Sequence, residues 1–272
     1  MDKGQDLKLG VGICTRNRAH GLSKTLMKLL QYRNEGPLWY DIFVADDGSE
    51  DEAQKHVLER ILRRILSESE PRHLTVDTNF GTSDNARVGV AKNKNRILRR
   101  FADCDYVVIF EDDVWPIHAD WLKVHIDASR ASGIHHFNFV PHSMPKHVGH
   151  MFEVSPYTLP DGELINVALT QYTTGVFLFY TQRVIQMLGG FDRRFGLYGF
   201  EHVEFSDRIR DPRIGLSPPG KGYPSILECE KYIYWNIHEP SVVSDEEKRA
   251  ELEKQKAVWA EVQRDMFLYR QF

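Results

Sequence analysis

Short apolar runs and amphipathic segments alternate through the first half of the chain. The runs are rich in β-branched and aromatic residues, which is typical of strands buried on both faces of a parallel sheet. The segments between them carry apolar residues three or four positions apart, as a helix that covers a sheet does. The predicted strands are residues 9–14, 41–45, 73–76 and 106–110, and the predicted helices are residues 23–32, 52–67 and 88–101. This alternation predicts an α/β fold with right-handed crossovers.

The second half of the chain has a less regular pattern. It predicts helices at residues 119–131 and 184–188, a strand at residues 173–180 and strand structure within residues 226–237. Residues 134–157 hold many histidines but no helix or strand pattern, so we expect an irregular loop there. Ser244 and Glu247 have the spacing of a capping box, which predicts the start of a charged helix that reaches about residue 269.

Three acids, Glu111, Asp112 and Asp113, directly follow the strand predicted at residues 106–110. Open α/β sheets bind their ligands at the carboxyl ends of the strands. Neighbouring carboxylates repel one another unless a cation neutralises them. Oxygen-only ligands suit Mg²⁺ or Mn²⁺ that is shared with the phosphates of a substrate. A solvated acidic turn is the plainer interpretation, but we favour a metal and phosphate site because the acids end a buried strand.

Composition narrows the class of protein. The 272 residues suit one large α/β domain, and the net charge of −4 gives no general basic field for nucleic acid. The three cysteines are too widely spaced for a zinc or disulfide framework, which predicts a reducing compartment. Residues 1–8 lack the apolar core of a signal peptide, and no apolar run is long enough to span a membrane. We therefore expect a cytoplasmic protein without a transmembrane segment.

The common glycine-rich phosphate loops are absent from the sequence. A dinucleotide-binding fingerprint needs glycines in the turn after the first strand. Here Gly10 and Gly12 lie inside the predicted strand, and the turn is Thr-Arg-Asn-Arg at residues 15–18. No P-loop is present either. Phosphate would therefore be held by side chains and a metal.

Four segments taken together resemble a known family. They are Thr15-Arg16-Asn17-Arg18, Ala45-Asp46-Asp47-Gly48-Ser49, Glu111-Asp112-Asp113 and the stretch from Gly189-Gly190-Phe191-Asp192 to Glu204. In this order they resemble motifs of the GT-A-fold, nucleotide-sugar-dependent glycosyltransferases, especially the inverting family 2. The similarity runs from Val11 to about His238.

The resemblance implies an α/β fold with a central, mostly parallel sheet flanked by helices, in a single GT-A domain of residues 1–272. Its parts would be a nucleotide-sugar-binding half at residues 9–115, an acceptor-side half at residues 116–240 and a C-terminal helix at residues 241–272.

The resemblance also implies a donor site. Asp47 would bind the nucleotide base, and Asp113 would be the direct ligand of Mn²⁺ or Mg²⁺, with His238 completing the metal shell. A UDP-sugar is the commonest donor of the family. The residues expected to bind the nucleotide sugar are Thr15, Arg16, Arg18, Asp46, Asp47, Lys94, Asn95, Glu111 and Asp112.

On the acceptor side, family members place a Glu-Asp pair at the start of a late helix, where a carboxylate is the general base. This chain has Glu201 and His202 there, and both residue types can take a proton from a hydroxyl group. The expected function is thus a metal-dependent inverting glycosyltransferase. Its hydroxyl acceptor stays open among a glycan, a lipid-linked sugar, a protein and a modified nucleic acid.

Two other functions compete with this one. A non-catalytic nucleotide or sugar binder would keep the fold and lose the base, and His202 in the usual carboxylate position is its support. A sugar-nucleotide nucleotidyltransferase uses a related sheet, but residues 15–18 lack the glycine-rich loop that grips a triphosphate. The charged C-terminal helix leaves homo-oligomerisation open.

Overall fold

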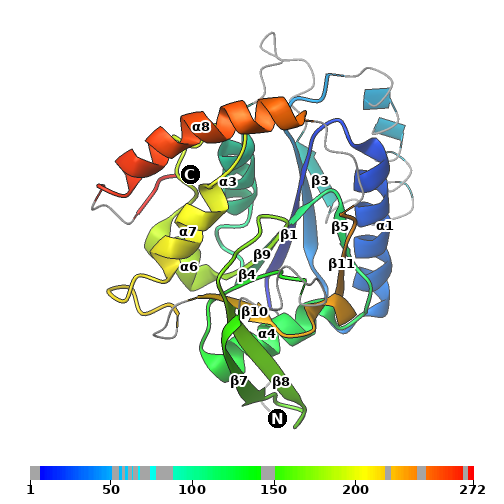
Figure 1. Cartoon of the computed structure of the whole chain (residues 1–272). Helices are drawn as coiled ribbons and strands as arrows, with labels where there is room; N and C mark the ends of the chain where they lie inside the picture. The colour runs from blue at the N-terminus through cyan, green and yellow to red at the C-terminus, as the bar shows by residue number, and fades with distance from the viewer. Residues whose placement is uncertain are drawn as a thin grey trace.

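A six-stranded sheet in the order β3-β2-β1-β4-β9-β6 forms the centre of the protein (Figure 1). The computed structural model describes residues 7–50, 74–77, 88–141, 151–217, 222–237, 243–265 and 269–272, with six helical positions between residues 55 and 67. The strands of this sheet are β1 (Leu9–Thr15), β2 (Asp41–Asp46), β3 (Leu74–Asp77), β4 (Tyr106–Glu111), β6 (His136–Asn138) and β9 (Phe177–Thr181). The first four run parallel, and β9 runs antiparallel to both β4 and β6. The predicted, mostly parallel α/β sheet is therefore confirmed.

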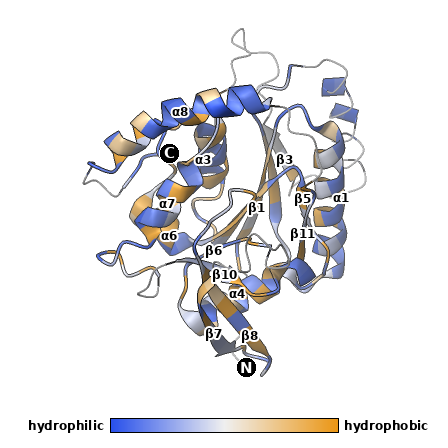
Figure 2. Cartoon of the chain, in the orientation of Figure 1, coloured by the Kyte–Doolittle hydropathy of each residue, from blue (hydrophilic) through white to orange (hydrophobic). Residues whose placement is uncertain are grey.

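Helices cover both faces of this sheet, with α1 on one side and α3, α6 and α7 on the other (Figure 1). Their bounds are α1 (Ala19–Glu35), α3 (Val90–Arg100), α4 (Trp121–Ser132), α6 (Gln182–Leu188), α7 (Glu201–Ile209) and α8 (Asp245–Val262). Strand alternation divides the core in two: Val108 and Phe110 of β4 pack with α1 and α4, and Val107 and Ile109 pack with α3 and α7. Figure 2 shows the hydrophobic strands between the more polar outer surfaces of α1 and α8.

Two glycines within β1 let α3 pack close to the sheet. A Cβ atom at Gly12 would lie 2.1 Å from the side chain of Ile97, and one at Gly10 would lie 2.3 Å from the ring of Phe101. These glycines therefore serve helix-to-strand packing, consistent with their position outside the phosphate-binding turn.

Two smaller sheets complete the fold. β7 (Met151–Thr158), β8 (Leu164–Thr170) and β10 (Tyr223–Ile226) form one, and β5 (Val114–Pro116) and β11 (Ile233–Trp235) form the other. The expectation of an irregular loop at residues 134–157 is wrong, because β6 and most of β7 lie there. β7 exposes most of its side chains, so it lacks the alternation that marks a half-buried strand. The C-terminal helix ends at Val262, earlier than predicted.

Among the helices within the described residues, none has the length and apolar character needed to cross a membrane.

Candidate active site

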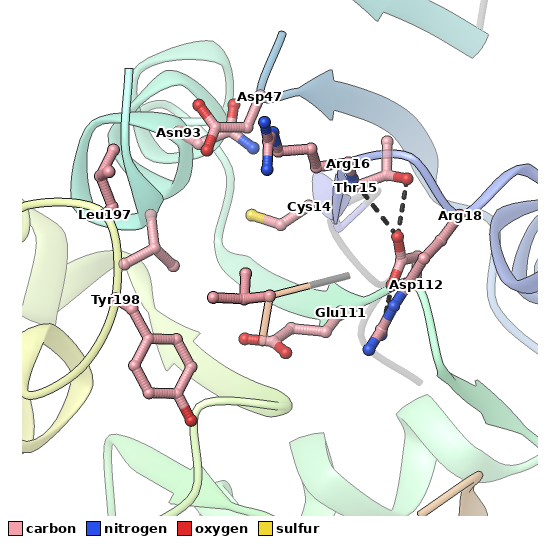
Figure 3. Close-up of a pocket in the computed structure, with 12 residues that line it drawn as sticks. Cys14, Thr15, Arg16, Arg18, Asp47, Asn93, Glu111, Asp112, Leu197 and Tyr198 are labelled. Atoms are coloured by element: carbon pink, nitrogen blue, oxygen red, sulfur yellow. Dashed lines mark hydrogen bonds and ion pairs between the residues drawn. The ribbon is translucent and has the colours of Figure 1, made fainter. Parts of the chain in front are cut away.

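The carboxyl ends of β1, β2 and β4 meet at one edge of the central sheet. The strand register places Thr15 beside Asp46 and Cys14 beside Glu111, so the polar residues that follow these strands converge. A pocket opens at this edge (Figure 3). It is lined by Cys14, Thr15, Arg16, Arg18, Asp47, Val90, Asn93, Glu111, Asp112, Leu197, Tyr198 and Val243.

Arg18 bridges the two aspartates of the acidic motif. Its guanidinium lies 3.0 Å from Asp112 Oδ1 and 3.0 Å from Asp113 Oδ2. Thr15 Oγ1 donates to Asp112 Oδ2 at 2.7 Å, as Figure 3 shows. Burial raises the pKa of Asp112 to about 6, although Arg18 opposes the shift. Burial likewise raises the pKa of Asp113. Burial therefore disfavours the charged form of both aspartates, and Arg18 offsets this only in part.

The two aspartates after β2 have different surroundings. Asp46 is fully buried, and its carboxylate accepts the Ser49 amide at 3.0 Å and the Ser49 hydroxyl at 2.6 Å. Asp47 faces the pocket, and its Oδ1 accepts the amides of Val88 at 2.8 Å and Gly89 at 3.0 Å. Asp46 thus shapes the turn, whereas Asp47 joins that turn to the start of α3.

A buried lysine links the acidic motif to the start of α7. Lys94 Nζ lies 3.0 Å from Glu201 Oε1, 3.5 Å from Glu111 Oε1 and 3.1 Å from the carbonyl oxygen of Gly175. Burial disfavours a charged lysine, but the two glutamates raise the pKa of Lys94 above its ordinary value. Burial would raise the pKa of Glu201, yet Lys94 and His202 hold it well below its usual range. Lys94 and Glu201 therefore form a charged pair.

His202 extends this chain of contacts toward solvent. Its Nδ1 lies 3.2 Å from Glu201 Oε1, and its side chain is 19% exposed, compared with 3% for that of Glu201. Gly175 makes room for this arrangement, because a Cβ atom there would lie 3.0 Å from both His202 Nδ1 and Lys94 Nζ. The imidazole is therefore the accessible member of the Glu201–His202 pair.

Not every predicted site residue reaches the pocket. Asn95 is buried, and its amide exchanges two hydrogen bonds with the backbone of Phe191 at 2.8 and 2.9 Å, so it secures the Gly-Gly-Phe-Asp segment. Asp113 lies beside the pocket, where its buried Oδ1 makes no hydrogen bond of ordinary geometry, although the Trp235 side chain interacts with the carboxylate. His238 lies outside the described residues. Within the described part of the chain, no three His, Cys, Asp or Glu side chains are gathered as a metal-holding group.

Sequence reasoning missed part of the pocket wall. Asn93, Leu197, Tyr198 and Val243 line it. Asn93 lies in the α3 segment already considered, and its Nδ2 donates to the carbonyl oxygen of Ala45 at 2.8 Å. Leu197 and Tyr198 stand between Gly196 and Gly199, just before Glu201. An aromatic residue flanked by glycines beside a candidate base was a signal that could have identified this wall.

Known proteins share the fold of this chain. The mannosyltransferase PcManGT from Pyrobaculum calidifontis, solved with GDP-Man and Mn²⁺, matches 98% of this chain and 69% of its own, at 17% identity and a TM-score of 0.59. GalNAc-T7, solved with UDP, GalNAc and Mn²⁺, matches 84% of this chain and 43% of its own, at 11% identity and a TM-score of 0.56. S. aureus TarS 1–349, solved with UDP-GlcNAc, matches 96% of this chain and 68% of its own, at 15% identity and a TM-score of 0.53.

These structural matches establish the GT-A glycosyltransferase fold. Residues 10–134 also match the family described as glycosyl transferase family 2. The chain thus has the GT-A glycosyltransferase fold, and its first half is similar to glycosyl transferase family 2. Comparison with curated protein sequences gave no match.

Proposed function

We propose that this protein is a metal-dependent inverting glycosyltransferase that moves a sugar from a nucleoside-diphosphate sugar to a hydroxyl acceptor. The observation that carries the proposal is the chain of contacts from Glu111 through Lys94 to Glu201 and His202. It links the acidic motif beside the donor pocket to a candidate base. Two of the three structures described above contain a uridine nucleotide and one contains GDP-Man. A UDP-sugar is therefore the first donor to test.

The acidic motif fits a divalent cation. Asp113 Oδ1 is a buried oxygen that makes no hydrogen bond of ordinary geometry, although the Trp235 side chain interacts with the carboxylate, and carboxylate oxygens suit Mn²⁺ and Mg²⁺. Asp113 and His238 would hold the ion in our proposal. When bound, the metal supplies Lewis-acid neutralisation of the charge that develops on the leaving diphosphate. Thr15 and Arg18 hold the carboxylate of Asp112, the neighbour of Asp113, in a fixed orientation.

The donor pocket has one part beside the start of α3 and another part that carries two arginines. Asp47, Asn93 and Val90 line the part beside the start of α3, and we assign the nucleoside to them. Arg16 and Arg18 supply positive charge at the pocket, and we assign the ribose and the diphosphate to their neighbourhood. The pocket's own acids disfavour an anion, so the two arginines and the metal together would offset their charge.

We assign the general base to His202. Glu201 is nearly inaccessible, and its charge is committed to Lys94, which makes it a weak proton acceptor. In our assignment, His202 Nδ1–H donates to Glu201 Oε1, which leaves Nε2 to accept a proton. An imidazole is a competent base near neutral pH. Glu201 and Lys94 would act through His202 as positioning residues.

The proposed step conserves atoms and charge. The acceptor hydroxyl oxygen forms a bond to the anomeric carbon from the face opposite the diphosphate, while the bond between that carbon and the diphosphate oxygen breaks. The hydroxyl proton passes to His202 Nε2, and the nucleoside diphosphate leaves with the bonding electron pair. Attack from the opposite face inverts the anomeric configuration.

A thermal-shift panel of nucleoside diphosphates, with and without Mn²⁺, tests the donor site. We expect one nucleotide to raise the melting temperature in a Mn²⁺-dependent way, because a ligand that binds the folded state stabilises it. Asp113→Asn should remove the Mn²⁺-dependent part of the shift, and Asp120→Asn, an exposed control, should keep it. No shift with any nucleotide, or an unchanged shift in Asp113→Asn, would contradict the proposed donor and metal site.

A further inference from the structure

The C-terminal helix α8 contacts the loop that forms one wall of the candidate active site. This loop, residues 195–200, leads directly into α7. Glu251 Oε1 accepts the backbone amide of Leu197 at 2.9 Å, and Gln255 Oε1 accepts that of Gly196 at 3.3 Å. Gln255 Nε2 also donates to Glu251 Oε1 at 2.8 Å, so the two side chains form one unit. Gln255 is buried, which is unusual for glutamine and indicates that its side chain has a structural role.

Packing reinforces these hydrogen bonds. The ring of Trp259 on α8 lies 5.5 Å from that of Phe200 and 6.2 Å from that of Phe195. Phe200 has φ 64°, a left-handed conformation that costs free energy for a residue with a bulky side chain. Such a conformation persists only when its surroundings hold it. Trp259 supplies a contact that does so.

Close approach between helix and loop depends on glycine. A Cβ atom at Gly196 would lie 2.6 Å from Glu251 Oε1, and one at Gly199 would lie 2.7 Å from Leu252 Cδ2. The loop also rests on the start of α3, since a Cβ atom at Gly89 would lie 2.6 Å from the carbonyl oxygen of Gly196. The loop is therefore held between α8 and the turn that Asp47 anchors.

The opposite side of the loop faces the site. Leu197 and Tyr198 line the pocket, and Figure 3 shows them on the side across from Glu111. Phe200 precedes Glu201 and accepts the amide of Glu204 at 2.9 Å, so its strained backbone starts α7. One short loop thus carries a donor-pocket wall and sets the origin of the Glu201–His202 pair.

We propose that Glu251 and Gln255 are positioning residues that fix this loop, and that α8 thereby sets both nucleotide affinity and the placement of His202. The proposal rests on the proposed function for the identity of the ligand. It gives α8 a role in the reaction that its charged sequence did not suggest. Glu251 and Gln255 accept hydrogen bonds from backbone amides, so the role does not depend on which side chains the loop carries.

The test uses the full chain and two readouts. Hydrogen–deuterium exchange reports on the amides of residues 195–200, and calorimetry measures the affinity for UDP with Mn²⁺. Glu251→Ala should speed exchange at the loop and weaken UDP binding about ten-fold, since a hydrogen bond to a charged group is lost. Glu251→Gln keeps an acceptor for the Leu197 amide and should restore most of both. Glu253→Ala, an exposed position on the same helix, should change neither.

The two readouts separate the possible failures. Unchanged loop exchange in Glu251→Ala would overturn the proposed clamp. Faster exchange with unchanged UDP affinity would overturn its link to the site. Equal loss in Glu251→Ala and Glu251→Gln would also contradict the proposal, because a general destabilisation would explain it. A wild-type protein that binds none of UDP, GDP and ADP would contradict the proposed function, and the exchange data would still decide whether α8 holds the loop.

Discussion

Buried charge at Lys94 is the residue-scale feature that organises the candidate site. A fully buried lysine is costly unless it is paired, and here two glutamates and a carbonyl oxygen surround it. The pairing makes Glu201 a fixed anion instead of a titrating base. The same contact orients His202 through Glu201. The sequence leaves Glu201 and His202 as alternative bases. In the structure, only the imidazole of His202 is accessible.

Substitution of His202 and Glu201 separates their proposed roles. His202→Ala should lower kcat about 10²–10⁴-fold, the usual contribution of a general base, with little change in nucleotide affinity. Glu201→Gln should lower kcat less and should alter the pH profile of kcat, because it removes the charge beside the imidazole and leaves the imidazole in place. Steady-state kinetics over a pH range, together with UDP binding, measure both effects.

Two different results would contradict the assignment of the base to His202. Near-normal turnover by His202→Ala would show that His202 is not the base. A larger loss of kcat in Glu201→Gln than in His202→Ala would assign the base to Glu201. Turnover is measured with an acceptor that the wild-type protein uses, or as UDP released by hydrolysis of the donor.

The sequence predicts which side chains lie at the carboxyl edge of the sheet where they follow buried strands, and it does so poorly where a neighbour decides their direction. Asp47 and Asp112 line the pocket as expected of strand-end acids. Asp46 turns away to Ser49, and Asn95 turns away to Phe191. Adjacent residues in a strand or on a helix point in different directions, but no spacing rule says which amide a buried side chain will meet. The wall at Leu197 and Tyr198 depends on α8, a contact more than fifty residues away that no local pattern encodes.

At the scale of elements, the contact between β1 and α3 depends on the absence of a side chain at Gly12. Val11 and Ile13 on either side are fully buried, so the strand cannot shift outward without exposing them. β1 ends at Thr15 and the turn after it carries Arg18, whereas α3 carries Asn93 and Lys94. Their relative position is therefore set by this close packing.

Gly12→Ala should destabilise the protein by about 1–3 kcal/mol, the usual cost of overpacking a core. The added Cβ would lie 2.1 Å from Ile97 Cγ2. Urea unfolding of the wild type, Gly12→Ala, Ile97→Ala and the double variant forms a complete cycle. We expect the double variant to be more stable than the sum of the two single changes predicts, because the smaller residue 97 relieves the clash. Strict additivity would contradict the packing role.

Periodicity predicted the elements of the first half because each has a buried face of its own. β1, β2 and β4 and helices α1 and α3 lie close to the expected ranges. β7 and β8 were missed, since β7 exposes most of its side chains and is stabilised by pairing with β8 over seven residue pairs. A strand that depends on its partner for stability leaves little trace in its own sequence.

At the scale of the whole molecule, two buried histidines should make the stability of the fold depend on pH. His125 on α4 lies 2.6 Å from the Trp121 carbonyl oxygen and packs 4.9 Å from the ring of Phe177. His136 on β6 stacks 4.7 Å from the ring of Tyr180 and contacts Ser206 of α7 at 2.9 Å. Burial lowers the pKa of each to about 4. Because they lie in the two halves of the divided core, protonation of either would disturb a different packing layer.

Because burial lowers the pKa of both histidines, acid should destabilise the folded protein. The unfolded chain takes up a proton on each histidine near the ordinary pKa of 6.5, whereas the folded protein does so only near 4. The unfolding free energy should therefore fall as pH drops from about 6.5 to about 4 and should gain nothing from these groups above that window. Each histidine should contribute on the order of 2–3 kcal/mol to this loss.

Urea unfolding at pH 6.5 and pH 4.5 measures the loss, and His125→Gln isolates one contribution. Glutamine can donate to the Trp121 carbonyl oxygen and does not titrate, so this variant should lose about 2–3 kcal/mol less between the two pH values than the wild type does. His118→Gln is a matched change at an exposed histidine and should keep the wild-type difference. Acid loss in His125→Gln equal to that of the wild type would mean that carboxylates elsewhere control the pH response. A reduced loss would instead show that a core histidine contributes to the acid sensitivity of the folded state.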